Sequence, residues 1–267
     1  MSKSRNANAD EPKNPIQPAE SLNEVGDLAA RALSVVAARA NRGTTSTSDG
    51  LVERLLDSAM GRSKETYRGV ARHMLSMGIA PEYIVDEYIP AVARRMGDEW
   101  CDDRSSFAAV TMGGSRLQAL LRELSTFWKA DEAAIPTTAG SSALVLVPPT
   151  SHHTLGGSVL ATQMRRIGLS VRLSIGGDIP TLASTLKGST FDTVIISASG
   201  SESTDHLREL VQISRQSGRL NTAPVVIGGG VLEQTIDIQA KIGADLATND
   251  IFEALDFCKI ATPRADK

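Results

Sequence analysis

The chain has 267 residues, of which 41% are hydrophobic and 22% are charged, with a formal net charge of −3. This composition is ordinary for a globular protein with about two domains, and its weak acidity argues against a general nucleic-acid clamp. The two cysteines, Cys101 and Cys258, stand far apart, which argues against a disulfide framework or a thiolate zinc site. Because neither a long apolar run nor a signal-peptide core occurs, we expect a cytoplasmic protein.

The first 46 residues divide into two parts. Residues 1–19 are polar and contain three prolines, so they cannot bury enough apolar surface to offset chain entropy, and we expect them to be disordered. Residues 21–43 repeat apolar side chains at helical spacing, which predicts an amphipathic helix that ends near Gly43. This helix either packs on its own domain or contacts a second copy or a partner, and the sequence leaves both open.

Residues 47–129 predict a small four-helix bundle. The helical patterns run over 49–61, 64–78, 81–100 and 105–128. The first two end at a glycine, as helices commonly do, and serines stand where they can cap the start of the last. Pro81 suits a first helical turn, whereas Pro90 lies inside the third pattern and is expected to break or kink it.

After a small and polar linker at 130–142, the pattern changes to strand and helix in alternation, which we assign to a domain over 143–262 with a short tail at 263–267. Apolar runs predict strands at 143–147, 170–175, 193–199, 224–228 and 244–248, with helices at 155–167, 180–187, 203–217, 231–241 and 249–259. Buried strands that alternate with helices predict a doubly wound, flavodoxin- or Rossmann-like parallel sheet, so the fold class is α/β with an N-terminal helical bundle.

Ligands on such sheets bind beyond the carboxyl ends of the strands, where this chain has the loops "TSHHTLGG", "SASGS" and "GGG". The dinucleotide pattern GxGxxG and the phosphate loop GxxxxGK[ST] are both absent, and no acidic residue closes the second strand. One loop histidine cannot build a zinc site, which needs three or four ligands, but it can be an axial ligand to a metal that a macrocycle already holds. The residues therefore leave a haem or a corrin as candidates.

The three loops resemble the cobalamin-binding domains of methionine synthase and methylmalonyl-CoA mutase, which carry Asp-x-His-x-x-Gly, then Ser-x-Leu, then Gly-Gly. This chain reads Ser151-His152-His153-Thr154-Leu155-Gly156, then after 40 residues (157–196) Ser197-Ala198-Ser199, and after 28 residues (200–227) Gly228-Gly229. Two positions depart from the family pattern: Ser151 replaces the Asp that orients the histidine, and Ser199 replaces the Leu.

The resemblance implies that His153 is the lower axial ligand of cobalt, with His152 beside it and Thr154 and Leu155 near the cofactor. The nucleotide tail of the cobalamin would pass into the sheet between the loops that bear Ser197 and Gly228-Gly229. Gly156 and Gly157 would leave space beside that tail, since glycine lets a ligand pass close to the backbone. Ser151 can still accept the ring N–H of His153, but it carries no charge.

The resemblance continues upstream and covers about residues 47–260. Cobalamin sensors and methionine synthase have a four-helix cap with Gly-x-x-Trp near the end of one helix, which here is Gly97-Asp98-Glu99-Trp100. It implies that Trp100 lies over the upper face of the corrin and that Val110, Thr111 and Gly114 line the site. Light-sensing relatives have Glu-His where this chain has Thr111-Met112, so a capping histidine from that position is absent.

Among such proteins the chain is most similar to the AerR/PpaA group, antirepressors of photosynthesis genes that carry the cap and the corrin domain alone. The resemblance implies a light- or redox-responsive, cobalamin-binding regulator that is not an enzyme. It would act through a DNA-binding repressor of the PpsR/CrtJ kind, since the chain shows no DNA-binding pattern of its own. Two alternatives remain open, a corrinoid carrier subunit of a methyltransferase and a haem-binding sensor on the same fold. The cobalamin form and the oligomeric state are also open.

Overall fold

A computed structural model describes residues 49–129, 140–149, 154–177, 179–215 and 223–261. The chain divides into two units, 1–50 and 51–267, and almost all of the first lies outside the described residues. The same holds for the expected disordered head and first helix, most of the linker, Ser151, His152, His153 and the C-terminal tail. No helix in the described ranges is long and apolar enough to cross a membrane.

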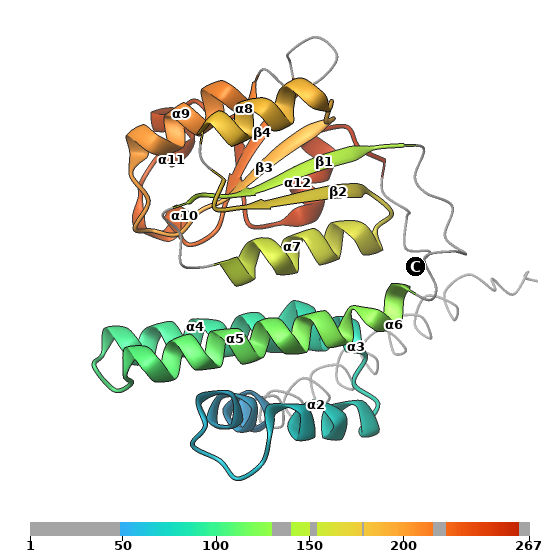
Figure 1. The fold of residues 1–267 in the computed structure, drawn as a ribbon, viewed down its shortest axis with the longest axis vertical. Coiled ribbons are helices and arrows are strands. Elements are labelled where there is room, and N and C mark those ends of the chain that lie inside the picture. Colours follow the sequence, from blue (N-terminus) through green and yellow to red (C-terminus); the bar gives the residue numbers. More distant parts are fainter. Residues whose placement is uncertain (1–48, 130–139, 150–153, 178, 216–222, 262–267) are drawn as a thin grey trace, which may run out of the picture. The chain divides into compact units, whose positions relative to one another are not determined.

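The described residues up to 129 form a helical bundle (Figure 1), which we call the cap. Residues 49–60 are helical and are followed by α2 (Tyr67–Ser76), α3 (Pro81–Tyr83), η1 (Ile84–Tyr88), α4 (Ile89–Cys101), α5 (Phe107–Leu124) and α6 (Thr126–Lys129). Thr66 caps α2 by accepting a hydrogen bond from the backbone N–H of Gly69, and Ser106 caps α5 in the same way through Ala109. Apolar side chains at helical spacing meet in one core, with Leu55, Met74, Ile84, Ile89 and Leu117 fully buried.

Pro90 does not break its helix. It occupies the first turn of α4, and the preceding turn, Ile84–Tyr88, is a wider π-helix. Proline lacks a backbone N–H, and its ring would collide with the carbonyl group four residues earlier in a regular α-helix. A π turn relieves that collision by changing which carbonyl faces the ring, so the helical path continues.

The remaining described residues form one parallel sheet of five strands in the order β2-β1-β3-β4-β5. The strands are β1 (Ser142–Val147), β2 (Ser170–Ile175), β3 (Thr193–Ser197), β4 (Val225–Gly228) and β5 (Leu246–Ala247). This is the flavodoxin-like strand order, and it confirms the predicted α/β fold class with a doubly wound parallel sheet. The register sets Ser197 opposite Gly228 at the carboxyl edge, where ligands bind on such sheets.

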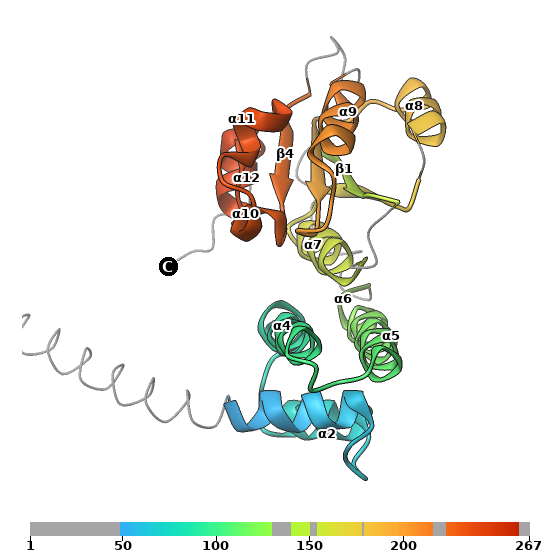
Figure 2. The same cartoon turned by 90° about the vertical axis from the view of Figure 1, so that its left-hand side faces the viewer.

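Helices cover both faces of the sheet (Figures 1 and 2). One face carries α8 (Ile179–Gly188), α9 (Thr204–Ser214) and α11 (Ile238–Ile242), and the other carries α7 (Thr154–Arg166) and α12 (Ile251–Phe257). A short helix, α10 (Val231–Gln234), follows β4. The single helix predicted over 231–241 is therefore wrong: it is interrupted at Asp237, whose φ of 55° lies in the left-handed region and cannot continue a right-handed helix.

Gly157 sets how closely α7 packs on the sheet. A Cβ atom at this position would lie 2.4 Å from Cγ2 of Val147, the last residue of β1, and 3.6 Å from Cβ of Ser197. No real Cβ contact is that short, so even alanine would push α7 away from the strands.

We expect Gly157→Ala to lower the free energy of unfolding by about 1–3 kcal/mol, because the added methyl group overpacks a closed contact. Urea denaturation of the purified protein, with no cofactor added, measures this change. Gly97→Ala is the matched control, since nothing lies within 4 Å of a Cβ atom built at that helical position. Glycine is a poor helix former, so the control should be neutral or up to about 1 kcal/mol more stable. Equal stability of both variants would contradict the packing role of Gly157.

Candidate functional site

The start of α7 meets the end of β3 at the carboxyl edge of the sheet. A Cβ atom at Gly156 would lie 3.6 Å from Oγ of Ser197, and both residues are at least partly exposed. The Ser197 hydroxyl is thus accessible beside an exposed glycine, and a ligand that lies against Gly156 can hydrogen-bond to it. The space expected beside Gly157 is absent, because Val147 fills it.

Gly228 and Gly229 allow the loops after β3, β4 and β5 to touch through their backbones. A Cβ atom would lie 2.7 Å from the carbonyl oxygen of Thr248 at Gly228, and 2.3 Å from that of Ala198 at Gly229, which also has a φ of 101°. The backbone N–H of Gly229 donates to Oδ1 of Asn249 at 2.6 Å. Both positions therefore require glycine for the loops to close on one another.

The loops after β3 and β4, between which the resemblance places the nucleotide tail, begin as a paired continuation of the two strands, and the path of the tail stays a prediction. The backbone N–H of Ala198 donates to the carbonyl oxygen of Gly228 at 2.9 Å, so the two loops are joined. The accessible side of this edge is the one that Ser197 shares with Gly156 on α7. Ser199 lies on the following loop, where its hydroxyl is 2.9 Å from that of Ser201.

The first turn of α7 also contacts the cap. Nε2 of Gln118, on α5, donates a hydrogen bond of 2.5 Å to Oγ1 of Thr154. Leu155 packs against the apolar core of the cap, in which Val159 is buried and Val110 is partly buried. Thr154, which follows His153, is thus held by a hydrogen bond from the cap. Leu155 and Val159 are held by packing against the apolar core of the cap.

The other predicted cap residues lie on α4 and α5. Thr111 is exposed, and nothing lies within 4 Å of a Cβ atom built at Gly114, so this part of α5 has open space beside it. The ring of Trp100, near the end of α4, is 45% exposed and lies 6.5 Å from that of Phe107 between centroids. The structure thus joins Thr154 to Gln118, packs Leu155 and Val110 against the same apolar core, and sets Gly156 beside Ser197, while Trp100 lies near Phe107.

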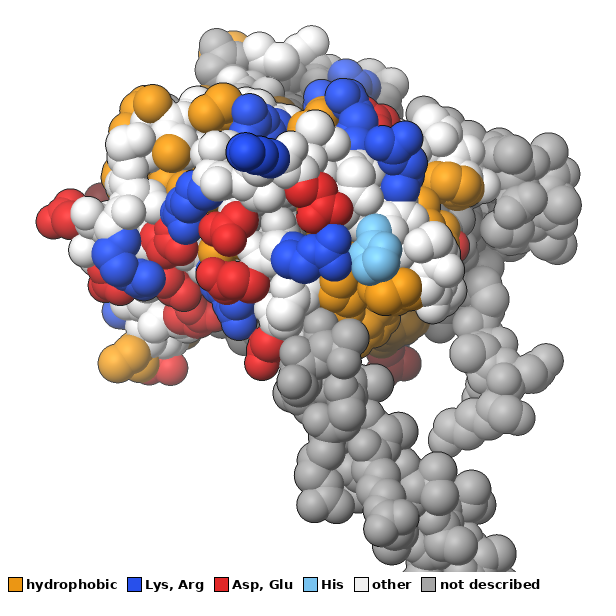
Figure 3. Space-filling model, turned by 90° about the horizontal axis from the view of Figure 1, so that it is seen from below, with side chains coloured by type: hydrophobic (Ala, Val, Ile, Leu, Met, Phe, Trp, Pro, Cys, Tyr) orange, Lys and Arg blue, Asp and Glu red, His pale blue; other side chains and the backbone are white. Residues whose placement is uncertain are grey.

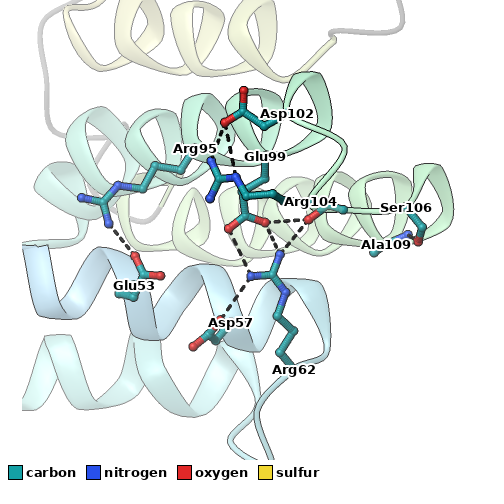
Figure 4. Close-up of polar contacts among 10 residues, drawn as sticks. Glu53, Asp57, Arg62, Arg95, Glu99, Asp102, Arg104, Ser106 and Ala109 are labelled. Atoms are coloured by element: carbon teal, nitrogen blue, oxygen red, sulfur yellow. Dashed lines mark hydrogen bonds and ion pairs between the residues drawn. The ribbon is translucent and has the colours of Figure 1, made fainter.

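A buried carboxylate holds the end of α4 in place (Figure 4). Glu99, directly before Trp100, is 8% exposed and accepts hydrogen bonds from the guanidinium of Arg62 and, at 2.6 Å, from the hydroxyl of Ser105. Asp57 lies 3.6 Å from the same guanidinium. The hydrogen bonds from Arg62 first, and then from Ser105, hold the pKa of Glu99 at about 2, well below its ordinary value. Glu99 is thus charged at neutral pH and ties α4 to two loops.

Sequence reasoning missed Gln118 and Glu99. Gln118 was detectable, because Thr111, Gly114 and Gln118 are three and four residues apart and so share one face of α5. Glu99 lies inside the Gly-x-x-Trp motif, but its partner Arg62 is 37 residues earlier and nothing local connects them. The predicted metal ligand His153, with Ser151 and His152, lies outside the described residues.

Comparison with known proteins identifies the family. No family model matches the sequence. The chain is 36% identical over 172 residues to the "uncharacterized 20.5 kDa protein in bchF-crtJ intergenic region" of Rhodobacter capsulatus, an alignment that covers 64% of this chain and 87% of that protein. The chain belongs to the family of this Rhodobacter capsulatus protein.

The fold of this bchF-crtJ family member is that of a corrinoid protein. It matches the structure of the Methanosarcina barkeri monomethylamine corrinoid protein with a TM-score of 0.61, over 79% of this chain and 97% of that one, at 15% sequence identity. A cobalamin-binding protein from Desulfitobacterium hafniense DCB-2 matches with a TM-score of 0.39 and 18% identity, over 78% of this chain and 97% of that one. The first likeness supports the fold class of cap and parallel sheet, whose carboxyl edge carries the residues described above.

We expect Glu99→Gln to destabilise the purified protein, with no cofactor added, by about 2 kcal/mol at pH 7, because it removes the charge that Arg62 pairs with. The difference from the parent protein should shrink on acidification. An unfolded glutamate titrates near pH 4.3 and the folded one at about 2, so the stabilisation is present above about pH 5 and disappears as the pH falls towards 2.

Urea denaturation at several pH values measures this dependence. The matched control is Glu53→Gln, which removes an exposed partner of Arg95 and should cost less than about 1 kcal/mol. A Glu99→Gln penalty that stays constant between pH 7 and pH 3 would contradict the assignment.

Proposed function

We propose that this protein binds a cobalamin between its cap and the carboxyl edge of its sheet and acts as a regulator through a DNA-binding repressor. One observation carries the proposal: the turn after His153 is joined to the cap through Thr154 and to the end of β3 through Gly156. A change in a cofactor that is ligated there would therefore act on both the cap and the sheet domain.

The described residues fit a corrinoid. Gly156 leaves a Cβ-free surface beside the accessible hydroxyl of Ser197, and Gly114 leaves open space on α5. His153 would supply the lower axial ligand, oriented by Ser151, and Trp100 an aromatic surface for the upper face. The bound group would supply a cobalt whose upper ligand changes with light or redox state. We do not favour a haem, because it has no nucleotide tail that could lie against Ser197 and Gly156. The likeness in fold is also to a corrinoid protein.

Regulation is supported by the relative, whose gene lies beside crtJ. A repressor of the PpsR/CrtJ kind is the partner that the resemblance to the AerR/PpaA antirepressors implies. The cap face seen from below carries basic side chains interspersed with acidic ones (Figure 3). The cap also has ion pairs of Arg54 with Glu65 and of Arg68 with Glu123, whose side chains are exposed. Mixed charge of this kind is a poor surface for DNA, which favours an action through a partner protein in the cytoplasm.

The alternative is a corrinoid carrier for a methyltransferase. The likeness in fold to the monomethylamine corrinoid protein favours it to the same extent as it favours cobalamin binding. A carrier must let a separate enzyme reach the cobalt, whereas a regulator must turn the state of the cobalt into a change that a partner recognises. The two functions therefore differ in whether a change of the cofactor alters the conformation of the protein and its affinity for a partner.

Replacing His153 with alanine should abolish cobalamin binding or weaken it at least tenfold, because the cobalt loses its lower imidazole ligand. Binding of hydroxocobalamin to purified protein, followed by absorbance and by equilibrium dialysis, measures this. His73→Ala is the control, since His73 is exposed on α2. Unchanged affinity and an unchanged spectrum in His153→Ala would rule out the axial role.

The cofactor state should change the hydrodynamic radius of the protein or its affinity for a CrtJ-like repressor. The physical reason is that a change in the upper ligand alters how the cap packs beside the site, and the partner binds the two states differently. Analytical ultracentrifugation of corrinoid-free, dark and illuminated protein, each with and without repressor, gives the readout. The carrier would be favoured if the three cofactor states behave identically, both without and with repressor, and if the protein passes a methyl group to a methyltransferase partner.

A further inference from the structure

A groove with both apolar and polar lining residues extends beside α7, on the side that faces α5 and the end of β2. It has a volume of about 430 Å³, which is within the usual size of small-molecule sites. Thr154 lines one part of it, and Arg165 and Arg166, at the other end of α7, line another. Among the described residues of the predicted corrinoid site, Thr154 lines this groove, and so does Gln118, which is hydrogen-bonded to Thr154.

The groove is basic. Arg122 from α5 and Arg165 and Arg166 from α7 line it, and no aspartate or glutamate is among its lining residues in the described part of the chain. Arg166 forms an ion pair with Asp86, so its charge is balanced. Arg165 uses one N–H to donate to the carbonyl oxygen of Val171 at 3.0 Å, and its remaining donors stay available.

Glu123, the acidic residue next to Arg122, interacts with Arg122 through its charge but is hydrogen-bonded to Arg68 instead. Both carboxylate oxygens of Glu123 accept hydrogen bonds from Arg68, at 2.5–2.9 Å. Within the described ranges, neither Arg122 nor Arg165 forms an ion pair with a carboxylate. Two exposed guanidinium groups thus line one groove, and each offers the paired N–H groups that bind a dianion such as phosphate.

The side of the groove formed by α7 offers hydrogen-bond acceptors. The hydroxyls of Ser158 and Thr162 donate at 2.9 Å to the backbone carbonyls four residues earlier, those of Thr154 and Ser158. Their hydrogens are used within the helix, and their oxygen lone pairs remain to accept from a ligand. Such a row favours a ligand with hydroxyl groups of its own.

The third part of the lining is apolar. Leu121 from α5 and Leu173 and Ile175 from β2 form it, and Ile175 is 49% exposed. A flat organic group that covers these side chains would remove apolar surface from water. The groove therefore combines donors for an anion, acceptors for hydroxyl groups and a surface for a planar apolar group.

We propose that this groove binds a nucleoside monophosphate. Its phosphate lies between Arg122 and Arg165, its ribose hydroxyls donate to Ser158 and Thr162, and its base covers Leu173 and Ile175. Because the ligand contacts both α5 and α7, it strengthens the contact between the cap and the sheet domain. The inference does not depend on the proposed cobalamin binding, since the groove and its lining residues are present in the structure with no cofactor bound.

Isothermal titration of AMP into the full-length, corrinoid-free protein at about 150 mM salt tests the proposal, a salt concentration that screens weak surface binding. We expect saturable binding of one AMP per chain. Adenosine, which lacks the dianion, and inorganic phosphate, which lacks the nucleoside, should each bind at least tenfold more weakly. The double variant Arg122→Gln/Arg165→Gln should also bind AMP at least tenfold more weakly.

The matched control is Arg104→Gln, which alters an exposed arginine paired with Asp102 and should leave AMP binding unchanged. Circular dichroism verifies that the variants are folded. The proposal is overturned if AMP shows no saturable binding, if the double variant binds it like the parent, or if adenosine binds as tightly as AMP. It is also overturned if cobalamin displaces AMP one for one, because the groove would then be part of the corrinoid site.

Discussion

Helix α7 is packed on two sides at once, and the arrangement of the candidate site depends on this. Towards the sheet, Gly157 lets the helix approach β1, and Ala161 and Met164 are fully buried. Towards the cap, Val159 is buried in the core of the bundle with Leu155 beside it. A helix held on two faces cannot shift against one without losing packing on the other. The end of the loop that carries His153 is therefore positioned by both parts of the protein.

Polar contacts with the cap at both ends of α7 add direction to this packing. Thr154 in the first turn accepts a hydrogen bond from Gln118, and Arg166 in the last turn pairs with Asp86 in the π turn of the cap. The ion pair is largely shielded, with side-chain exposures of 17% and 25%, so it is less screened than the surface pairs of the cap. A movement of α5 would act directly on Thr154, the residue after the predicted ligand. The same contacts line or adjoin the basic groove, so an anion bound there would act on the same helix.

The strands β1, β3 and β4 were predictable because they are buried on both faces and therefore read as continuous apolar runs, such as "ALVLV" and "TVIIS". The positions of the glycine loops followed from the strands. What local sequence could not supply are contacts between distant residues. The ion pair of Glu99 with Arg62 and the hydrogen bond of Gln118 with Thr154 join segments about 36 residues apart. The interruption at Asp237 depends on one left-handed residue, and the wide turn before Pro90 on a single backbone clash.

The end of α4 combines a buried charge with exposed aromatic rings. Glu99 fixes the backbone through Arg62 and Ser105, yet the next residue, Trp100, is 45% exposed, and Phe107 beside it is 71% exposed. Large aromatic side chains gain most when they are covered, so two of them on a rigidly anchored helix end are suited to contact a flat ligand. Because Glu99 keeps its charge down to about pH 2, this anchor is insensitive to physiological pH. In the proposed function, the backbone at Trp100 would therefore stay in place when the cofactor changes. The conformational response would arise in how the cap packs on α7.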